Sequence, residues 1–246
     1  MSPLIASMLL VFSAPGYPGT SADAQPLVDE FAAAAAAAAH WSSGSLTAVY
    51  DATEQGSLAK LAAPDAALAF MPWPFYVQHA ADLHLVPLVQ ADVSPVGTRQ
   101  KWTLVMKSGA VAGSGLTITS TAGYAPKFVR AALGAWPLPA GVAINASSQV
   151  LSALRRAAAG EPVAVLLDQE QAGALPGLPF AAGLRTVATS APVPVALVAM
   201  VEGRLPKART EPLRAALLKL SATPAGAAAL SKLRLNGFVA ADLPPP

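Results

Sequence analysis

The sequence has no cysteine, few charged residues and no long apolar run. The absence of cysteine from all 246 residues excludes disulfide bonds, thiolate metal ligands, a cysteine nucleophile and a lipoprotein anchor. Charged residues make up only 12% of the chain and hydrophobic residues 54%, so membrane insertion has to be considered. The longest apolar stretches, residues 4–14, 66–77 and 191–201, are shorter than the roughly 20 residues that span a bilayer. We therefore expect no membrane insertion and an alanine-rich interior.

The chain also lacks a strong charge of either sign and the common catalytic motifs. Sixteen Lys and Arg residues balance 14 Asp and Glu residues, for a net charge of +2, and no basic stripe for nucleic acid is present. The motifs G-x-S-x-G, P-loop and G-x-G-x-x-G are missing. His40, His79 and His84 do not have the spacing of metal ligands. The sequence predicts no cofactor, no metal and no enzyme.

The N-terminal stretch has two interpretations. Its apolar run has the length of a signal h-region, and Ala22-Asp23-Ala24 resembles a signal-peptidase site. A signal peptide also has a basic n-region, but no Lys or Arg precedes Lys60. The alternative is that the run is the first strand of the fold, and the residues of this stretch leave the choice open.

Strands and helices alternate along the rest of the chain. We expect strands at residues 45–50, 66–71, 85–90 and 102–106, with helices at 25–41, 54–61 and 75–82 between them. The pattern then restarts, with strands at 116–119, 142–144 and 163–167 and helices at 125–133, 149–159 and 170–174. A long strand at 193–201 and helices at 211–220 and 224–233 close the chain. This order predicts an α/β fold with parallel sheets.

Four sequence blocks resemble one family. The C-terminal block LRAALLKLSATPAGAAALSKLRLNGFVAAD, residues 213–242, is similar to the end of the phosphate/phosphonate-binding family of periplasmic solute-binding proteins of ABC transporters. Three further blocks follow the order of that family: ITSTAGYAPKFVRAALG, LSALRRAAAGEPVAVLLD and APVPVALVAM. The chain departs from the family at Pro162, where members often have an Asp after the Gly-Glu turn.

The resemblance implies the type 2 periplasmic binding protein fold. Two α/β lobes are expected, each a mainly parallel sheet flanked by helices, with two crossing strands near Leu104 and Ala196 as the hinge. Lobe one would hold residues 1–104 and 197–246, and lobe two residues 105–196. Because family members begin with a strand, a glycine/serine loop and a helix, residues 4–12 are expected to be a strand, with the export signal missing from this chain.

The function that the resemblance implies is capture of a small solute by lobe closure and its delivery to an ABC transporter permease. The expected protein is a periplasmic monomer, and the expected ligand is an anionic organic compound such as a phosphonate. Two alternatives remain open: a lyase or transferase on the same fold, and a sensor that passes the signal to a partner protein.

The candidate ligand-binding residues follow strands. Ser120, Thr121, Gly123 and Tyr124 form a hydroxyl-rich turn before a helix, where backbone N–H groups can bind an anion; N-capping by Ser120 or Thr121 is the alternative. Trp73 and Tyr76 are expected to form an aromatic lip. Ser147 and Ser148 are further candidates, although they could instead cap a helix. Asp168 is another, for which a helix cap is an equally good account. Ser13 is also a candidate, and the weaker ones are Tyr17, Tyr50, Asp51 and Glu54.

Overall fold

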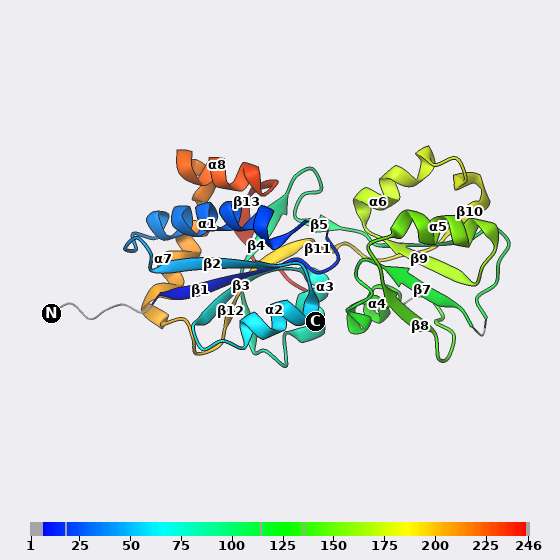
Figure 1. Cartoon of the computed structure of the whole chain (residues 1–246), viewed down its shortest axis with the longest axis horizontal. Coiled ribbons are helices and arrows are strands. Elements are labelled where there is room, and N and C mark those ends of the chain that lie inside the picture. Colours follow the sequence, from blue (N-terminus) through cyan, green and yellow to red (C-terminus); the bar gives the residue numbers. More distant parts are fainter. Residues whose placement is uncertain (1–6, 18, 114, 135, 245–246) are drawn as a thin grey trace. The chain divides into compact units, whose positions relative to one another are not determined.

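The computed structural model describes residues 7–17, 19–113, 115–134 and 136–244 of the chain. The chain divides into two compact units (Figure 1). Unit 1 comprises residues 1–99 and 194–246, and unit 2 comprises residues 100–193. Both units are α/β, in agreement with the expected fold class.

Unit 1 contains a six-stranded sheet in the order β13-β4-β12-β3-β1-β2. Its strands are β1 (Met8–Ser13), β2 (Leu46–Asp51), β3 (Ala66–Pro72), β4 (Leu85–Val93), β12 (Ala196–Val201) and β13 (Leu235–Ala240). Strand β1 lies between β2 and β3 and is parallel to both. The expected first strand is therefore confirmed from Met8 onward, whereas Ser7 is not part of it and residues 4–6 lie outside the described residues.

The sheet of unit 1 is mixed rather than all parallel. Strand β12 lies between β3 and β4 and is antiparallel to both, and β13 is antiparallel to β4 at the edge. The expected mainly parallel sheet is confirmed, since β1, β2, β3 and β4 run in the same direction, whereas β12, which returns from unit 2 and inserts between β3 and β4, and β13 run against them.

Helices cover both faces of this sheet (Figure 1). They are α1 (Ser21–Ala38), α7 (Lys207–Leu218) and α8 (Pro224–Lys232) on one face, and α2 (Glu54–Leu61) and α3 (Trp73–His79) on the other. The buried side of α1 is largely alanine, which confirms the close-packed alanine face. Phe31 of α1 meets Phe12 of β1 edge to face, with ring centroids 5.3 Å apart, so the core of unit 1 joins helix and sheet through aromatic rings.

Helix α1 begins four residues earlier than expected. Thr20 is its N-cap, and the Thr20 hydroxyl accepts a hydrogen bond from the Asp23 backbone N–H over 3.2 Å. The Ala22-Asp23-Ala24 tripeptide is therefore the first turn of a capped helix. Helix α3 likewise begins at Trp73 instead of Phe75, because Pro74 favours the first turn of a helix.

Unit 2 contains a five-stranded sheet in the order β10-β6-β9-β7-β8. Its strands are β6 (Thr103–Lys107), β7 (Thr117–Ser120), β8 (Ala143–Ala146), β9 (Val163–Leu167) and β10 (Leu184–Thr189). Strands β7, β8 and β9 are parallel, whereas β6 is antiparallel to β9 and β10. Helices α4 (Pro126–Ala132), α5 (Val150–Ala159) and α6 (Gln169–Ala174) flank this sheet, together with the short 3-10 turns η1 (Leu175–Gly177) and η2 (Ala181–Gly183). Strand β10 was not predicted. A third 3-10 turn, η3 (Leu220–Ala222), lies between α7 and α8.

Two short strands pair where the chain passes between the units. They are β5 (Arg99–Gln100) and β11 (Val193–Pro194). The expected continuous strand over residues 193–201 is interrupted. The N–H of Val195 donates to the carbonyl oxygen of Thr98 over 3.1 Å before β12 begins, and Pro194 has no N–H to extend the pairing. The connection is therefore a two-stranded ribbon.

Candidate functional site

Three loops of unit 2 follow parallel strands and lie at one edge of its sheet. They begin at Ser120 after β7, at Ser147 after β8 and at Asp168 after β9. Because parallel strands share their carboxyl edge, the structure brings these predicted residues together within unit 2. In open α/β sheets this edge is where ligands bind.

Ser120 joins all three loops. Its buried hydroxyl donates to the carbonyl oxygen of Leu166 over 2.8 Å and accepts from the N–H of Ala122 over 3.1 Å. Its carbonyl oxygen accepts from the N–H of Gly123 over 3.1 Å and of Ser147 over 2.9 Å. A serine hydroxyl can donate one hydrogen bond, and Ser120 donates it to the carbonyl oxygen of Leu166. The Ser120 side chain therefore holds the edge together and has no proton left for a ligand.

The residues that follow Ser120 form a turn, and helix α4 begins only at Pro126. Its N-cap is Ala125, with no side-chain cap, so neither Ser120 nor Thr121 caps it. Helix α4 begins within one residue of the expected start at residue 125, because Pro126 fixes the first helical position. Gly123 is required in the turn, because a Cβ atom there would lie 2.2 Å from the carbonyl oxygen of Asn145.

Open hydrogen-bond donors remain at this edge. The N–H groups of Thr121 and Ser148 have no acceptor among the residues that the structure describes. Thr121 is half-buried and Ser148 exposed. The Ser147 hydroxyl accepts from the N–H of Gln149 over 3.1 Å, whereas helix α5 has Gln149 as its N-cap and no side-chain cap. The edge therefore offers neutral N–H and O–H groups and no cation.

Asp168 is the N-cap of helix α6. Its carboxylate accepts from the N–H of Gln171 over 2.8 Å, and the Gln171 side chain accepts from the N–H of Asp168, which completes a capping box. Burial raises the pKa of the Asp168 carboxyl, and the nearby charge of Glu170 adds to the increase, while the backbone hydrogen bonds oppose it. The helix-cap interpretation thus describes Asp168 in this structure.

Unit 1 has a comparable edge after β1, β2 and β3. Ser13, the last residue of β1, is 2% exposed, and its hydroxyl has no partner among the described residues. The next N–H, of Ala14, donates to the carbonyl oxygen of Asp51 over 2.9 Å. A buried hydroxyl without a partner costs free energy, so Ser13 is the predicted residue of unit 1 most in need of an external partner. Tyr17 is 43% exposed in the following loop.

Trp73 and Tyr76 lie at the next position of this edge. Their rings stack with centroids 5.2 Å apart, and the backbone N–H of Trp73 donates to the carbonyl oxygen of Val195 over 3.0 Å. Both side chains are buried, at 2% and 7% exposure. The expected aromatic lip is therefore a packed aromatic pair, because the early start of α3 directs both rings inward.

The carboxylates of unit 1 have partners. Asp51 forms an ion pair with Lys60 and accepts hydrogen bonds from Thr53. Burial disfavours the Asp51 carboxylate, but the bonds from Lys60 and Thr53 and the Lys60 charge outweigh it, so its pKa is lowered. Glu54 lies 2.8 Å from His79 Nε2. Tyr50 is half-buried, and burial, helped by the Asp51 charge, raises its pKa.

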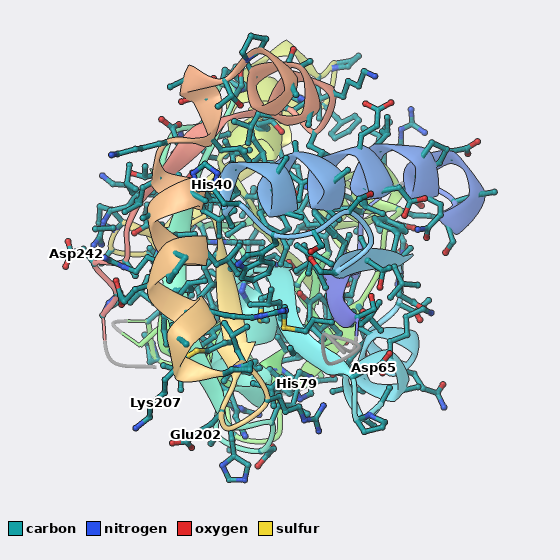
Figure 2. All side chains as sticks on the ribbon, turned by 90° about the vertical axis from the view of Figure 1, so that its left-hand side faces the viewer. His40, Asp65, His79, Glu202, Lys207 and Asp242 are labelled. Atoms are coloured by element: carbon teal, nitrogen blue, oxygen red, sulfur yellow. The ribbon has the colours of Figure 1, made fainter. Side chains whose placement is uncertain are left out.

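The histidines lie apart and form no joint site. Figure 2 shows His79 well away from His40, which follows α1. No group of three or more His, Cys, Asp or Glu residues suited to a metal ion occurs in the described part of the chain. Among the described helices, none is both long and apolar enough to cross a bilayer.

One residue at the edge of unit 2 was not predicted. Trp102 directly precedes β6, and the pairing of Thr103 with Leu167 places it beside Asp168. The sequence signal was weak, since a single aromatic residue before a strand is most often part of a core.

Comparisons with known proteins agree with this architecture. Residues 146–244 match the family described as ABC transporter, phosphonate, periplasmic substrate-binding protein. No curated protein sequence matches the chain.

Solved structures share the fold at low sequence identity. The Xanthomonas citri protein XAC2383 bound to chloride has a TM-score of 0.73 at 13% identity, over 95% of this chain and 92% of that one. PhnD1 from Prochlorococcus marinus, in complex with methylphosphonate, has a TM-score of 0.61 at 13% identity, over 96% and 93%. A binding-protein component of an ABC phosphonate transporter from Pseudomonas aeruginosa has a TM-score of 0.59 at 14% identity, over 96% and 82%.

These likenesses establish the type 2 periplasmic binding protein fold. The family match covers the C-terminal part of the chain, including Ser147, Asp168 and the return through β12. The C-terminal part of the chain is thus similar to the periplasmic substrate-binding proteins of phosphonate ABC transporters, and the whole chain shares their fold.

Proposed function

We propose that the protein captures a small anionic organic solute outside the cytoplasm, as a monomer, and delivers it to the permease of an ABC transporter. The similarity of residues 146–244 to the phosphonate substrate-binding family supports a small solute and a permease partner. We infer the class of ligand from the carboxyl edge of unit 2, where the N–H groups of Thr121 and Ser148 have no acceptor among the described residues.

The donors at this edge suit an oxyanion. No Lys or Arg occurs in residues 120–125, 145–149 or 168–171, so the charge would be held by hydrogen bonds alone. Converging backbone N–H groups bind anions without a cationic side chain. A phosphonate, sulfonate or carboxylate group fits this donor set, with the Thr121 hydroxyl as a further donor.

An organic ligand is favoured over inorganic phosphate. The organic group of the ligand adds apolar contact worth about 25 cal/mol per Å² buried, which inorganic phosphate cannot make. The Prochlorococcus marinus protein of the same fold holds methylphosphonate, which makes this compound the first probe. The unpartnered hydroxyl of Ser13 is the donor that we assign to unit 1.

We infer binding without chemical turnover. The acids at the two edges are engaged: Asp51 with Lys60, Glu54 with His79, and Asp168 as a helix cap. A general acid or base needs a group that can reach a substrate proton. These carboxyl groups instead make contacts within the fold.

Closure about the β5–β11 ribbon is the proposed mechanism. A ligand that contacts both units favours the closed state by the difference in its affinity for the two states, and a short two-stranded connection is a suitable hinge.

Native mass spectrometry of the protein as purified tests the proposal. We expect a bound small molecule whose mass matches an organic oxyanion. A thermal-shift panel of methylphosphonate, methanesulfonate, acetate and inorganic phosphate should show stabilisation by at least one organic anion. Stabilisation by phosphate alone would contradict the organic class, and a Thr121→Val variant that responds as the wild type does would show that the Thr121 hydroxyl is not a ligand donor, since this substitution keeps the backbone N–H.

A further inference from the structure

Trp102 lies at the carboxyl edge of unit 2, in line with the loops described above. The antiparallel pair β6 and β9 matches Thr103 with Leu167, so Trp102 and Asp168 are the next two residues along the strands. Strand β9 is followed in the sheet by β7, which ends at Ser120. Thr119 pairs with Val165, so Ser120 lies level with Leu166, and Trp102 and Asp168 lie at the same edge just beyond the end of β7.

The indole of Trp102 is buried with an unused donor. The side chain is 1% exposed, and Nε1–H has no acceptor among the described residues. Trp N–H groups usually find a partner when they are buried. Leaving such a donor without one costs free energy comparable to a lost hydrogen bond.

The ring is held firmly in place. It meets Phe128 of α4 edge to face, with centroids 5.1 Å apart and planes at 70°. Its backbone is fixed by Ser190: the Trp102 N–H donates to the Ser190 hydroxyl over 2.9 Å, and the Ser190 N–H donates to the Trp102 carbonyl oxygen over 2.8 Å. Because the ring packs against Phe128 and the backbone is bonded to Ser190, the indole cannot rotate freely to find an acceptor. Its N–H donor is therefore held in one position.

The contact with Phe128 shows which helix the Trp102 ring packs against. Phe128 belongs to helix α4, which follows directly after the turn that starts at Thr121. The Trp102 ring and the turn that carries the open N–H of Thr121 are therefore both next to α4, at the same edge of the sheet.

We propose that the indole N–H of Trp102 donates a hydrogen bond to an oxyanion oxygen of the solute bound at the edge of unit 2. This inference rests on the proposed function. Trp102 would then be a ligand-recognition residue that completes an all-neutral donor set with the N–H groups of Thr121 and Ser148. A donor of this kind favours a phosphonate, sulfonate or carboxylate oxygen over any group without an acceptor.

The variant Trp102→Phe tests the proposal, since it retains an aromatic ring beside Phe128 and removes the N–H. Trp136→Phe is the matched control, because Trp136 follows the C-terminal end of α4 in the same unit. We expect the Kd for methylphosphonate, measured by calorimetry, to rise about tenfold or more in Trp102→Phe, as for loss of a hydrogen bond to a charged group. It should stay unchanged in Trp136→Phe.

The melting temperature of the ligand-free variant distinguishes a ligand-binding role of the indole N–H from a structural one. Removing an unsatisfied buried donor should leave the melting temperature of the ligand-free protein within about 4 °C of the wild type or raise it. An unchanged Kd together with a clearly lower melting temperature would overturn the proposal, since it would show that the N–H serves the fold.

Nuclear magnetic resonance covers the case in which Trp102→Phe does not fold. In the 15N-labelled wild type, methylphosphonate should shift the Trp102 indole N–H signal downfield and slow its exchange with solvent. A signal unaffected by saturating ligand would overturn the inference and leave the proposed function standing. If the wild type binds none of the four panel anions, both the proposed function and the inference are wrong.

Discussion

The hydroxyl of Ser120 donates to the carbonyl oxygen of Leu166 over 2.8 Å and thereby ties the end of β7 to the end of β9. Next to it, Thr121 has a free N–H and a half-buried side chain. The two hydroxyl residues, adjacent in sequence, therefore differ: the first stabilises the edge of unit 2, and the second is the one that we propose as a ligand contact.

The first prediction separates these roles. Ser120→Ala should lower the free energy of unfolding by about 1–3 kcal/mol, because it leaves the buried Leu166 carbonyl oxygen and the Ala122 N–H without their partner. Thr121→Val should change stability by less than about 0.5 kcal/mol and weaken anion binding about threefold to tenfold. Denaturant unfolding and calorimetry on both variants measure this. Equal stability losses in the two variants would contradict the assignment.

The second prediction concerns Gly56 and Asp51. A Cβ atom on Gly56 would lie 2.2 Å from Oδ2 of Asp51, so Gly56→Ala should destabilise the protein although alanine favours a helix by about 1 kcal/mol. In an Asp51→Ala background the clash is gone, and the same substitution should be neutral or stabilising. A double-mutant cycle by denaturant unfolding tests this change of sign. Additive effects would mean that the two residues do not compete for space.

The third prediction uses the raised pKa of Asp168. A carboxyl group whose pKa is higher in the folded than in the unfolded state destabilises the fold once it ionises, so this contribution appears as the pH rises through and above the unfolded value of about 3.9. Asp168→Asn keeps an N-cap side chain and removes the charge. Its stability relative to the wild type should therefore improve between about pH 4 and pH 7. Parallel pH-dependent melting curves would show instead that Asp168 does not titrate differently in the two states.

The fourth prediction concerns closure. If the units close on the solute about the β5–β11 ribbon, saturating methylphosphonate should reduce the radius of gyration. Small-angle scattering on the same sample with and without ligand measures this, with Thr121→Val at non-saturating ligand as a control that should shift less. Bound ligand with identical scattering curves would argue for a rigid binding protein.

Parts of the fold and of the site could be predicted from local sequence, and other parts could not. The bounds of α2 and the strand at residues 163–167 were predicted because capping residues and apolar runs are local signals. The insertion of β12 between β3 and β4 depends on pairing between distant segments, which periodicity does not encode.

The same distinction applies to the site. Proximity of Ser120, Ser147 and Asp168 followed from parallel strands sharing an edge. The use of the Ser120 proton by Leu166, the inward direction of Trp73 and the unpartnered indole of Trp102 depend on neighbours supplied by other strands and helices. Residue type and spacing alone do not distinguish such a structural hydroxyl from a ligand donor.

The most direct test of the central claim is a calorimetric titration of the purified, ligand-stripped protein with methylphosphonate, compared with inorganic phosphate. We predict one site per chain with a Kd in the micromolar range or below, corresponding to about −8 kcal/mol or more favourable, and weaker binding of inorganic phosphate. Absence of heat for methylphosphonate, methanesulfonate and acetate alike, under conditions where the protein is folded, would contradict the account.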